Sequence, residues 1–238
     1  MKYSITCLIL LVANQTSLMA CPFCNRDIMN GIYNSTFYPN LLTMLSAFVV
    51  LAAIVFALVI ISTRRYKKWM INYPGNRLRS PVPLTTASVI LGIGLGGFLD
   101  GILLHQVFQV HEMLSNKIPA TDYVGKSINM FWDGIFHLFC LLVVLTGIIL
   151  LWKTARRKEI DKSGNLLAGG LLVGWALFNI VEGIIDHQVL KLHNVIELSP
   201  DHSPGNYGFL VISFIMLCVG ALIIKKKPAL NTQSAGQE

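Results

Sequence analysis

Long apolar runs dominate the chain, and short polar segments separate them. Five runs, residues 41–62, 85–108, 130–152, 167–190 and 207–224, are near the length of about 20 residues that crosses the hydrocarbon core of a bilayer as a helix. Only helices satisfy their own backbone hydrogen bonds in such a span. The pattern therefore predicts an all-α integral membrane protein with a five-helix transmembrane bundle. Residues 41–62 carry no charge and should form a lipid-facing anchor.

Composition and charge placement favour the same class of protein. Of the 238 residues, 54% are hydrophobic and 13% are charged, which is not the balance of a soluble domain. The net charge of +7 comes from short basic clusters beside the apolar runs, so it sets orientation and does not indicate a nucleic-acid partner. The clusters lie in residues 64–79, 153–162 and 225–227. The positive-inside rule makes them cytoplasmic, with the N-terminus outside and the C-terminus cytoplasmic.

The N-terminal residues have the features of a secretory signal. Residues 1–20 combine a basic start at Lys2, an apolar stretch too short to span a membrane, and Ala20 at the junction. We expect a periplasmic CxxC segment at 21–40, the anchor at 41–62, a four-helix membrane domain at 85–225 and a cytoplasmic tail at 226–238. The protein should be a multi-pass membrane protein.

The periplasmic segment begins with "CPFC", Cys21 to Cys24. Two thiols at this spacing can bind a soft metal or form a disulfide. Lipidation of Cys21, which the preceding "LMA" also permits, would preclude both. Fewer than twenty residues separate the motif from the first span, which leaves no room for a thioredoxin-type domain.

A phrase with ionisable residues occurs twice, at the outer ends of the second and fourth spans. "LDGILLHQVFQVH" covers residues 99–111 and "VEGIIDHQVLKLH" covers 181–193, an offset of 82 residues. The third span has a shorter version, "WDGIFH", at residues 132–137. Spans two and three therefore resemble a parallel duplicate of spans four and five, as internal repeats do in other membrane proteins.

The repeated phrases place imidazoles and carboxylates at similar depth, within about 10 Å. Ionised carboxylates inside a membrane must face the bundle interior and find partners there. Imidazole with carboxylate suits a transition metal, so we expect an outward-opening copper, zinc or iron site between spans two, three and four. The leading ligands are His105, His137 and His187. Supporting carboxylates are Asp100, Asp133, Glu182 and Asp186; weaker ligands are His111, His193, Cys140, Cys21 and Cys24.

Two geometric expectations follow from α-helical periodicity. Asp100 and His105 should lie about 140° apart on their helix, with His105 facing its equivalent His187. His111, His193 and His202, beyond the helix ends, should be ordinary interfacial residues.

Other functions use the same residues. A purely structural membrane subunit would need only a hydrogen-bonded network, and a path for protons or ions would need the same groups. A membrane-embedded metal-dependent hydrolase would use Glu182 or Asp186 as base. A haem-binding electron carrier would use His105 and His187 as axial ligands. Metal handling could support respiratory-enzyme assembly, with a respiratory or metal-handling membrane complex as partner.

The three motifs together resemble an uncharacterised bacterial membrane-protein family, domain of unknown function 2243, over about residues 85–225. The resemblance implies a bacterial inner-membrane protein and no particular substrate. The family pattern has a histidine after each of the positions 111 and 193, where this chain has Glu112 and Asn194. This departure argues against His111 and His193 as ligands.

Overall fold

The computed structural model describes residues 25–72 and 79–225. These residues form the helices α2 (Arg26–Ile32), α3 (Phe37–Asn72), α4 (Val82–Leu99), α5 (Tyr123–Ala155), α6 (Gly164–Glu182) and α7 (Ser203–Lys225). Two π-helical segments, η1 (Asp100–Val107) and η2 (Gly183–Val189), continue α4 and α6 directly. The described part contains no strand beyond an isolated bridge between Ser80 and Ile160.

The predicted five-helix membrane bundle is confirmed. Five helical units are long and apolar enough to cross a membrane: α3, α4 with η1, α5, α6 with η2, and α7. The helices extend beyond the apolar runs, most of all α3, whose 36 residues continue through "RRYKKWMIN". Charged and aromatic residues form helix readily, so an apolar run marks the part inside hydrocarbon and not the helix ends. Residues 1–24, including the expected signal peptide, Cys21 and Cys24, lie outside the described residues.

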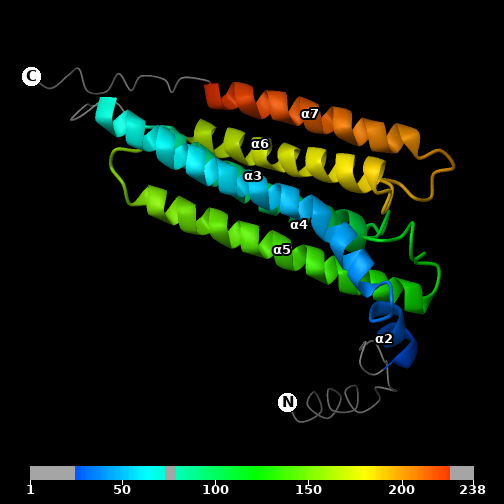
Figure 1. Cartoon of the computed structure of the whole chain (residues 1–238). Helices are drawn as coiled ribbons and strands as arrows, with labels where there is room; N and C mark the ends of the chain where they lie inside the picture. The colour runs from blue at the N-terminus through cyan, green and yellow to red at the C-terminus, as the bar shows by residue number, and fades with distance from the viewer. Residues whose placement is uncertain (1–24, 73–78, 226–238) are drawn as a thin grey trace, which may run out of the picture.

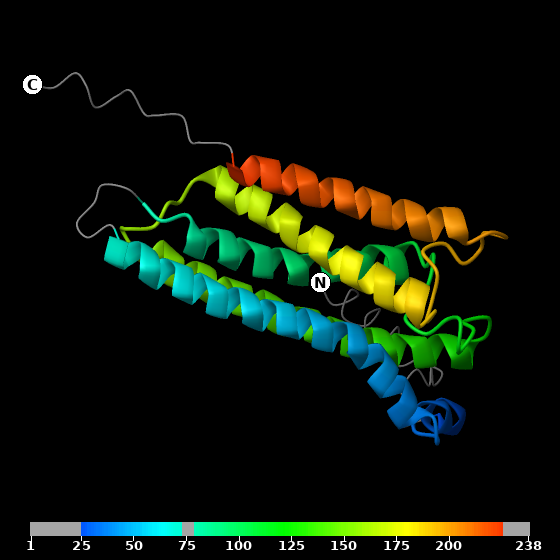
Figure 2. The same cartoon turned by 45° about the horizontal axis from the view of Figure 1, so that its top comes forward.

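The helices run roughly side by side, with α4 and α6 at the centre (Figure 1). Helix α5 packs on α4 and α7 packs on α6, while α3 lies across and contacts both central helices (Figure 2). Glycines permit the central contact. A methyl group on Gly92 would overlap the backbone of Leu171, and one on Gly174 would lie 2.7 Å from the Ile93 nitrogen. The helices approach this closely because neither position has a Cβ.

One stripe of α3 is buried, although we expected an anchor that faces lipid. Met44, Ala47, Phe48 and Leu51 are buried at helical spacing, and the Phe48 ring stacks on Phe136 of α5 with centroids 5.6 Å apart. Much of the rest of α3 is exposed, including Leu42 and Phe56. The helix therefore contacts both the bundle and the surroundings.

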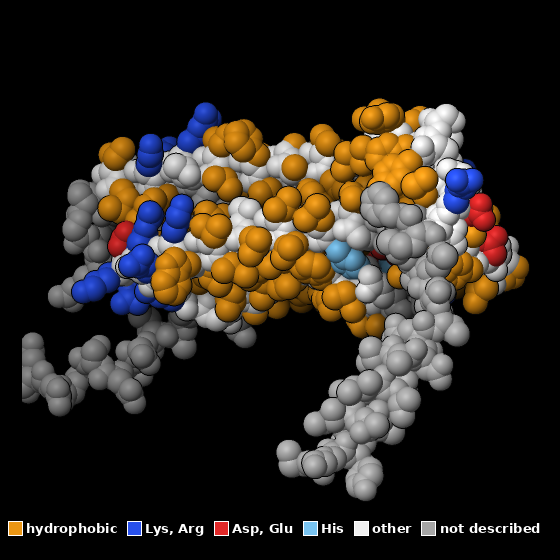
Figure 3. All heavy atoms as spheres, turned by 90° about the horizontal axis from the view of Figure 1, so that it is seen from below, with side chains coloured by type: hydrophobic (Ala, Val, Ile, Leu, Met, Phe, Trp, Pro, Cys, Tyr) orange, Lys and Arg blue, Asp and Glu red, His pale blue; other side chains and the backbone are white. Residues whose placement is uncertain are grey.

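The two ends of the bundle differ in charge (Figure 3). Lys and Arg side chains gather at the end where α3 and α5 finish and α4 begins, which we call the basic end. Ser80 joins the loops there, because its nitrogen donates to the Glu159 oxygen over 2.9 Å and its oxygen accepts from the Asp161 nitrogen. The opposite end, which we call the histidine end, holds η1 and η2.

Candidate metal centre

The π-helical segments set the first contacts at the histidine end. A π-helix closes i to i+5 hydrogen bonds, so residues five apart meet on one face. His105 Nε2 lies 3.1 Å from Asp100 Oδ2 in η1, and His187 Nε2 lies 2.6 Å from Glu182 Oε1 at the start of η2. The expectation that Asp100 and His105 point about 140° apart is wrong, because it assumed α-helical geometry. The same pair forms in both segments.

Helix α5 contributes Asp133 to this arrangement. Its Oδ1 lies 2.8 Å from His105 Nδ1 and also accepts the backbone nitrogen of Met113 over 3.3 Å. His105 therefore stands between two carboxylates, Asp100 and Asp133. A neutral imidazole donates only one hydrogen bond, so the second carboxylate requires either a proton on the ring or another cation.

Beyond each π-helix the chain turns back towards the bundle. Gln109 and Lys191, at equivalent positions, both have a φ of 50°, a conformation that residues other than glycine rarely adopt. The turn returns His111 and His193 to the interior, where they are 2% and 1% exposed. The prediction that these two histidines are interfacial is wrong, because the chain folds back after the helix end. His202 is partly exposed, and its Nδ1 lies 3.1 Å from the Ile196 oxygen.

His111 and His193 are each held by a backbone carbonyl of the other half. His111 Nδ1 lies 2.9 Å from the Val195 oxygen, and His193 Nδ1 lies 3.1 Å from the Met113 oxygen. A carbonyl oxygen can only accept, so Nδ1 of each ring carries the proton. In the neutral ring the lone pair then lies on Nε2. His111 Nε2 has no hydrogen-bond partner among the described residues.

The charge state of His111 fits a lone-pair donor. Burial lowers its pKa well below the usual value, and the neighbouring His105 and His193 rings lower it further. The neutral form therefore predominates at neutral pH. A buried neutral imidazole with an unpartnered Nε2 is a good ligand for a transition metal.

Four imidazole rings meet in nearly two-fold symmetry. The rings of His111 and His193 stack with centroids 4.8 Å apart and an interplanar angle of 7°. His105 contacts His111 edge-on at 4.5 Å, and His187 contacts His193 edge-on at 4.6 Å. His105 and His187 therefore lie on opposite sides of the central stacked pair. They do not form a facing pair of their own.

Carboxylates surround the rings, and one of them has no partner. Glu182 Oε1 lies 3.0 Å from His193 Nε2 in addition to its contact with His187. Asp186 is 0% exposed, and neither of its oxygens has a hydrogen-bond partner within the described ranges. An unpartnered buried carboxyl group is expensive unless a proton or a cation satisfies it. The cluster therefore has unused capacity to bind a cation.

Two groups of side chains bring their ligand atoms within 4.8 Å of one another. One comprises His105, His111 and His193, and the other comprises Glu182, His187 and His193. His193 belongs to both. We call these five residues, with Asp100, Asp133 and Asp186, the histidine cluster.

The leading triad of the sequence analysis is not brought together. His105 and His187 fall into different groups, and His137 belongs to neither. His137 is partly exposed and stacks on Phe98 with ring centroids 5.7 Å apart. On α5 it is Asp133, one helical turn earlier, that reaches the cluster. Cys140, one turn further, is buried beside Gly97 and also lies outside both groups.

The side chains of the site are buried, whereas we expected an outward-opening site. All eight members of the histidine cluster are between 0% and 8% exposed. The segments after η1 and η2 fold back and cross-link: the Asn116 nitrogen donates to the Leu192 oxygen over 3.0 Å, and the Glu197 nitrogen to the Val110 oxygen over 3.1 Å. Met113, Leu114 and Leu192 are buried in these segments.

Sequence reasoning ranked His111 and His193 too low. Their only signal in the sequence was that they recur at the offset of 82 residues. Three other pairs of residues have the same offset: Gly92 and Gly174, Gln109 and Lys191, and the carbonyl partners Met113 and Val195. Two kinds of contact occur at both members of a pair: the histidine to carbonyl contacts of His111 and His193, and the carboxylate contacts of His105 and His187.

Comparisons with known proteins give limited functional information. The chain is similar to the "Lysylphosphatidylglycerol biosynthesis bifunctional protein LysX" of Mycobacterium sp. (strain KMS), with 25% identity over 151 residues that cover 58% of this chain and 13% of that protein. The protein of the same description from Mycobacterium sp. (strain JLS) is 24% identical over the same shares. The chain thus matches only a small part of these relatives. No solved structure matches it.

The family comparison covers the part of the chain that holds the histidine cluster. Residues 87–227 match a family described as "Predicted membrane protein (DUF2243)". This region includes most of α4, all of α5 to α7 and both π-helical segments. The chain is a multi-pass membrane protein and belongs to the DUF2243 family.

Proposed function

We propose that the protein binds a transition-metal ion in the histidine cluster and handles copper, zinc or iron in a bacterial inner membrane. One observation carries the proposal. The carbonyl oxygens of Val195 and Met113 hold the Nδ1 protons of His111 and His193, which leaves the Nε2 atom of each ring as the one that can bind an ion, and both rings belong to one group of ligand atoms within 4.8 Å of one another. Metal-binding histidines are commonly oriented through their second nitrogen in this way.

The residues present fit such an ion. His111 offers a neutral nitrogen donor. His193 Nε2 and Glu182 Oε1 lie 3.0 Å apart, and both would become donors when an ion replaces the proton between them. His105 and His187 complete the two groups that share His193. Nitrogen with carboxylate donors suits zinc, copper or iron. Asp133 and the two carbonyls would orient the ligands.

The main alternative is a structural network without an ion. Protons on His105, His187 and His193 would also satisfy the close approaches to Asp100, Asp133 and Glu182. That arrangement leaves His111 Nε2 and both oxygens of Asp186 without partners among the described residues. A bound cation near His111 would give its Nε2 a partner, which is why we favour metal binding.

The packing argues against two other functions. The rings of His111 and His193 both lie against His105 and His187, so a porphyrin could not insert between the latter pair without displacing them. A hydrolase needs substrate access, whereas every member of the cluster is buried.

Metal content tests the proposal. Detergent-purified protein should bind about one equivalent of zinc or copper per chain in equilibrium dialysis followed by elemental analysis. H111A and H193A should lose this binding. H202A, at a partly exposed histidine outside the cluster, is the matched control and should keep it. H137A should also keep it, which separates the structural ligand set from the triad that the sequence favoured. Wild-type protein that binds no metal would leave a structural network as the function.

We also propose that the histidine end faces the periplasm after cleavage of a signal peptide at residues 1–20. The support is the basic end, since lysine and arginine concentrate on the cytoplasmic side. The CxxC segment with Cys21 and Cys24 would then lie on the same side as the cluster and could deliver metal to it, for example for respiratory-enzyme assembly. A periplasmic reporter fused after Lys225 should be inactive, and a cytoplasmic reporter there should be active.

We further propose that α4, η1 and α5 are a duplicate of α6, η2 and α7. The paired histidines, their carbonyl partners and the two residues at φ 50° all recur at the same offset. A duplicated unit explains why the cluster has nearly two-fold symmetry.

A further inference from the structure

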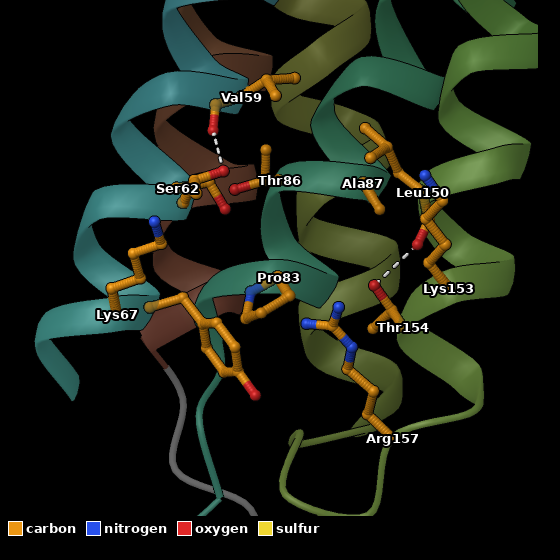
Figure 4. A pocket seen from close by; sticks show the side chains of 12 residues that line it. Val59, Ser62, Lys67, Pro83, Thr86, Ala87, Leu150, Lys153, Thr154 and Arg157 are labelled. Atoms are coloured by element: carbon orange, nitrogen blue, oxygen red, sulfur yellow. Dashed lines mark hydrogen bonds between the residues drawn. The ribbon is translucent and has the colours of Figure 1, made fainter. Parts of the chain in front are cut away.

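The basic end contains a second pocket, far from the histidine cluster along the helices. It has a volume of about 330 Å³ and lies between α3, α4 and α5 (Figure 4). Each wall comes from a helix that is long and apolar enough to cross a membrane. The pocket therefore lies on the flank of the bundle, where lipid meets protein.

Three cationic side chains line the part of the pocket that lies nearest the basic end of the bundle. They are Lys67 on α3, Lys153 near the end of α5, and Arg157 just beyond it. No carboxylate is among its lining residues. Arg157 extends into the space between α3 and α5 in Figure 4, and its guanidinium lies 5.5 Å from the Tyr66 ring centroid. Lys67 and Lys153 have no ion-pair partner within the described part of the chain.

Glu159, next to the pocket, accepts a hydrogen bond from Tyr66 over 2.7 Å and offsets part of the charge of Arg157, whereas the hydroxyl groups of the pocket balance none of the charge of Lys67 and Lys153. Thr86 and Thr154 donate to the Val82 and Leu150 oxygens of their own helices, over 2.9 and 2.8 Å. Neither hydroxyl carries a charge. The pocket therefore attracts an anion through its cations.

The opposite part of the pocket is apolar. Val59, Ala87 and Leu150 lie one to two helical turns closer to the centre of the bundle than the three cations. A free phosphate ion gains nothing from such a wall. A molecule with an anionic head and an apolar tail matches both parts, with the tail directed towards the bilayer centre.

We propose that this pocket binds the headgroup phosphate of an anionic phospholipid, with an acyl chain against Val59, Ala87 and Leu150. Basic pockets between transmembrane helices are a general mode of anionic-lipid recognition. The bound lipid joins α3 to α4 and α5 at the end of the bundle opposite the histidine cluster, so this site is independent of metal binding.

Native mass spectrometry of protein from nanodiscs tests the proposal. With phosphatidylcholine and phosphatidylglycerol in equal amounts, wild-type protein should retain phosphatidylglycerol preferentially. K153Q/R157Q should weaken this retention about 25-fold, which corresponds to about 2 kcal/mol at 1.4 kcal/mol per tenfold. K153R/R157K keeps both charges and should retain the lipid. R64Q/K68Q removes two exposed charges of α3 outside the pocket lining and should also retain it.

Three outcomes would overturn the assignment. Wild-type protein could show no preference between the two lipids, R64Q/K68Q could lose as much lipid as K153Q/R157Q, or inorganic phosphate could displace the bound lipid completely. The last result would assign the pocket to a soluble phosphate. Only variants that elute as monodisperse protein enter the comparison, so a folding defect does not count as lost binding.

Discussion

Replacement of Glu182 by glutamine gives a quantitative test of the histidine cluster. Glu182 is 3% exposed, and its Oε1 approaches both His187 and His193, at 2.6 and 3.0 Å. The variant E182Q keeps the size of the side chain but removes the charge that both rings share. Breaking a buried ion pair from one side costs about 3–5 kcal/mol. At about 2–4 °C per kcal/mol for a chain of this size, the melting temperature should fall by about 6–20 °C.

The equivalent variant in the other half, D100N, should have a smaller effect. Among the described residues Asp100 forms an ion pair with His105 alone, and His105 keeps its 2.8 Å contact with Asp133 when Asp100 is neutral. The loss should be about 1–3 kcal/mol, the range of one hydrogen bond to a charged group. D27N, at an exposed carboxylate of α2, is the control and should change stability by less than about 0.5 kcal/mol.

Thermal unfolding in mild detergent with a chelator measures these differences, because the chelator removes any stabilisation by bound metal. The order E182Q, D100N, D27N from largest to smallest loss is the expected result. An E182Q variant as stable as D27N, or equal losses of stability in E182Q and D100N, would refute the argument that Glu182 matters more because it contacts two histidines and Asp100 contacts one.

Three further predictions concern packing, backbone conformation and protons. G174A should destabilise the bundle by about 1–3 kcal/mol because the added methyl group meets the backbone of α4, whereas G208A, which has open space around it, should not; thermal unfolding distinguishes them. K191G should keep the fold and add up to about 1 kcal/mol to the free energy of unfolding, and K191V should lose more than that, since the backbone there has a φ of 50°. Zinc binding at neutral pH should release protons, because an imidazole that is held between carboxylates must lose a proton before its lone pair can bind the ion. Calorimetry in two buffers of different ionisation enthalpy measures the release, and identical heats in the two buffers would contradict it.

The membrane-spanning architecture could be predicted from the sequence because the bilayer imposes it. An apolar run of about 20 residues has to be a helix in lipid, whatever its neighbours are. The close approach of α4 and α6 could also be anticipated from glycines such as Gly92 and Gly174. These features depend on residue type and spacing alone.

The arrangement of the histidine cluster could not be derived in the same way. Asp100 and His105 meet only because they lie in a π-helical segment, which is rarer than an α-helix. The contact of His105 with Asp133 on another helix supports this segment. The return of His111 depends on the positive φ at Gln109, a residue type that does not signal such a turn. Both features result from tertiary contacts, and the local pattern therefore placed His137 among the leading ligands and His111 among the weaker ones.

X-ray absorption spectroscopy of zinc-loaded protein tests the central claim most directly. Multiple scattering identifies imidazole ligands, and our account predicts at least two of them in wild-type protein and in H202A, while H111A and H193A should show no zinc bound by imidazole. A zinc environment made only of oxygen or sulfur, or a spectrum that H111A and H193A leave unchanged, would contradict binding of the ion by the stacked pair of His111 and His193.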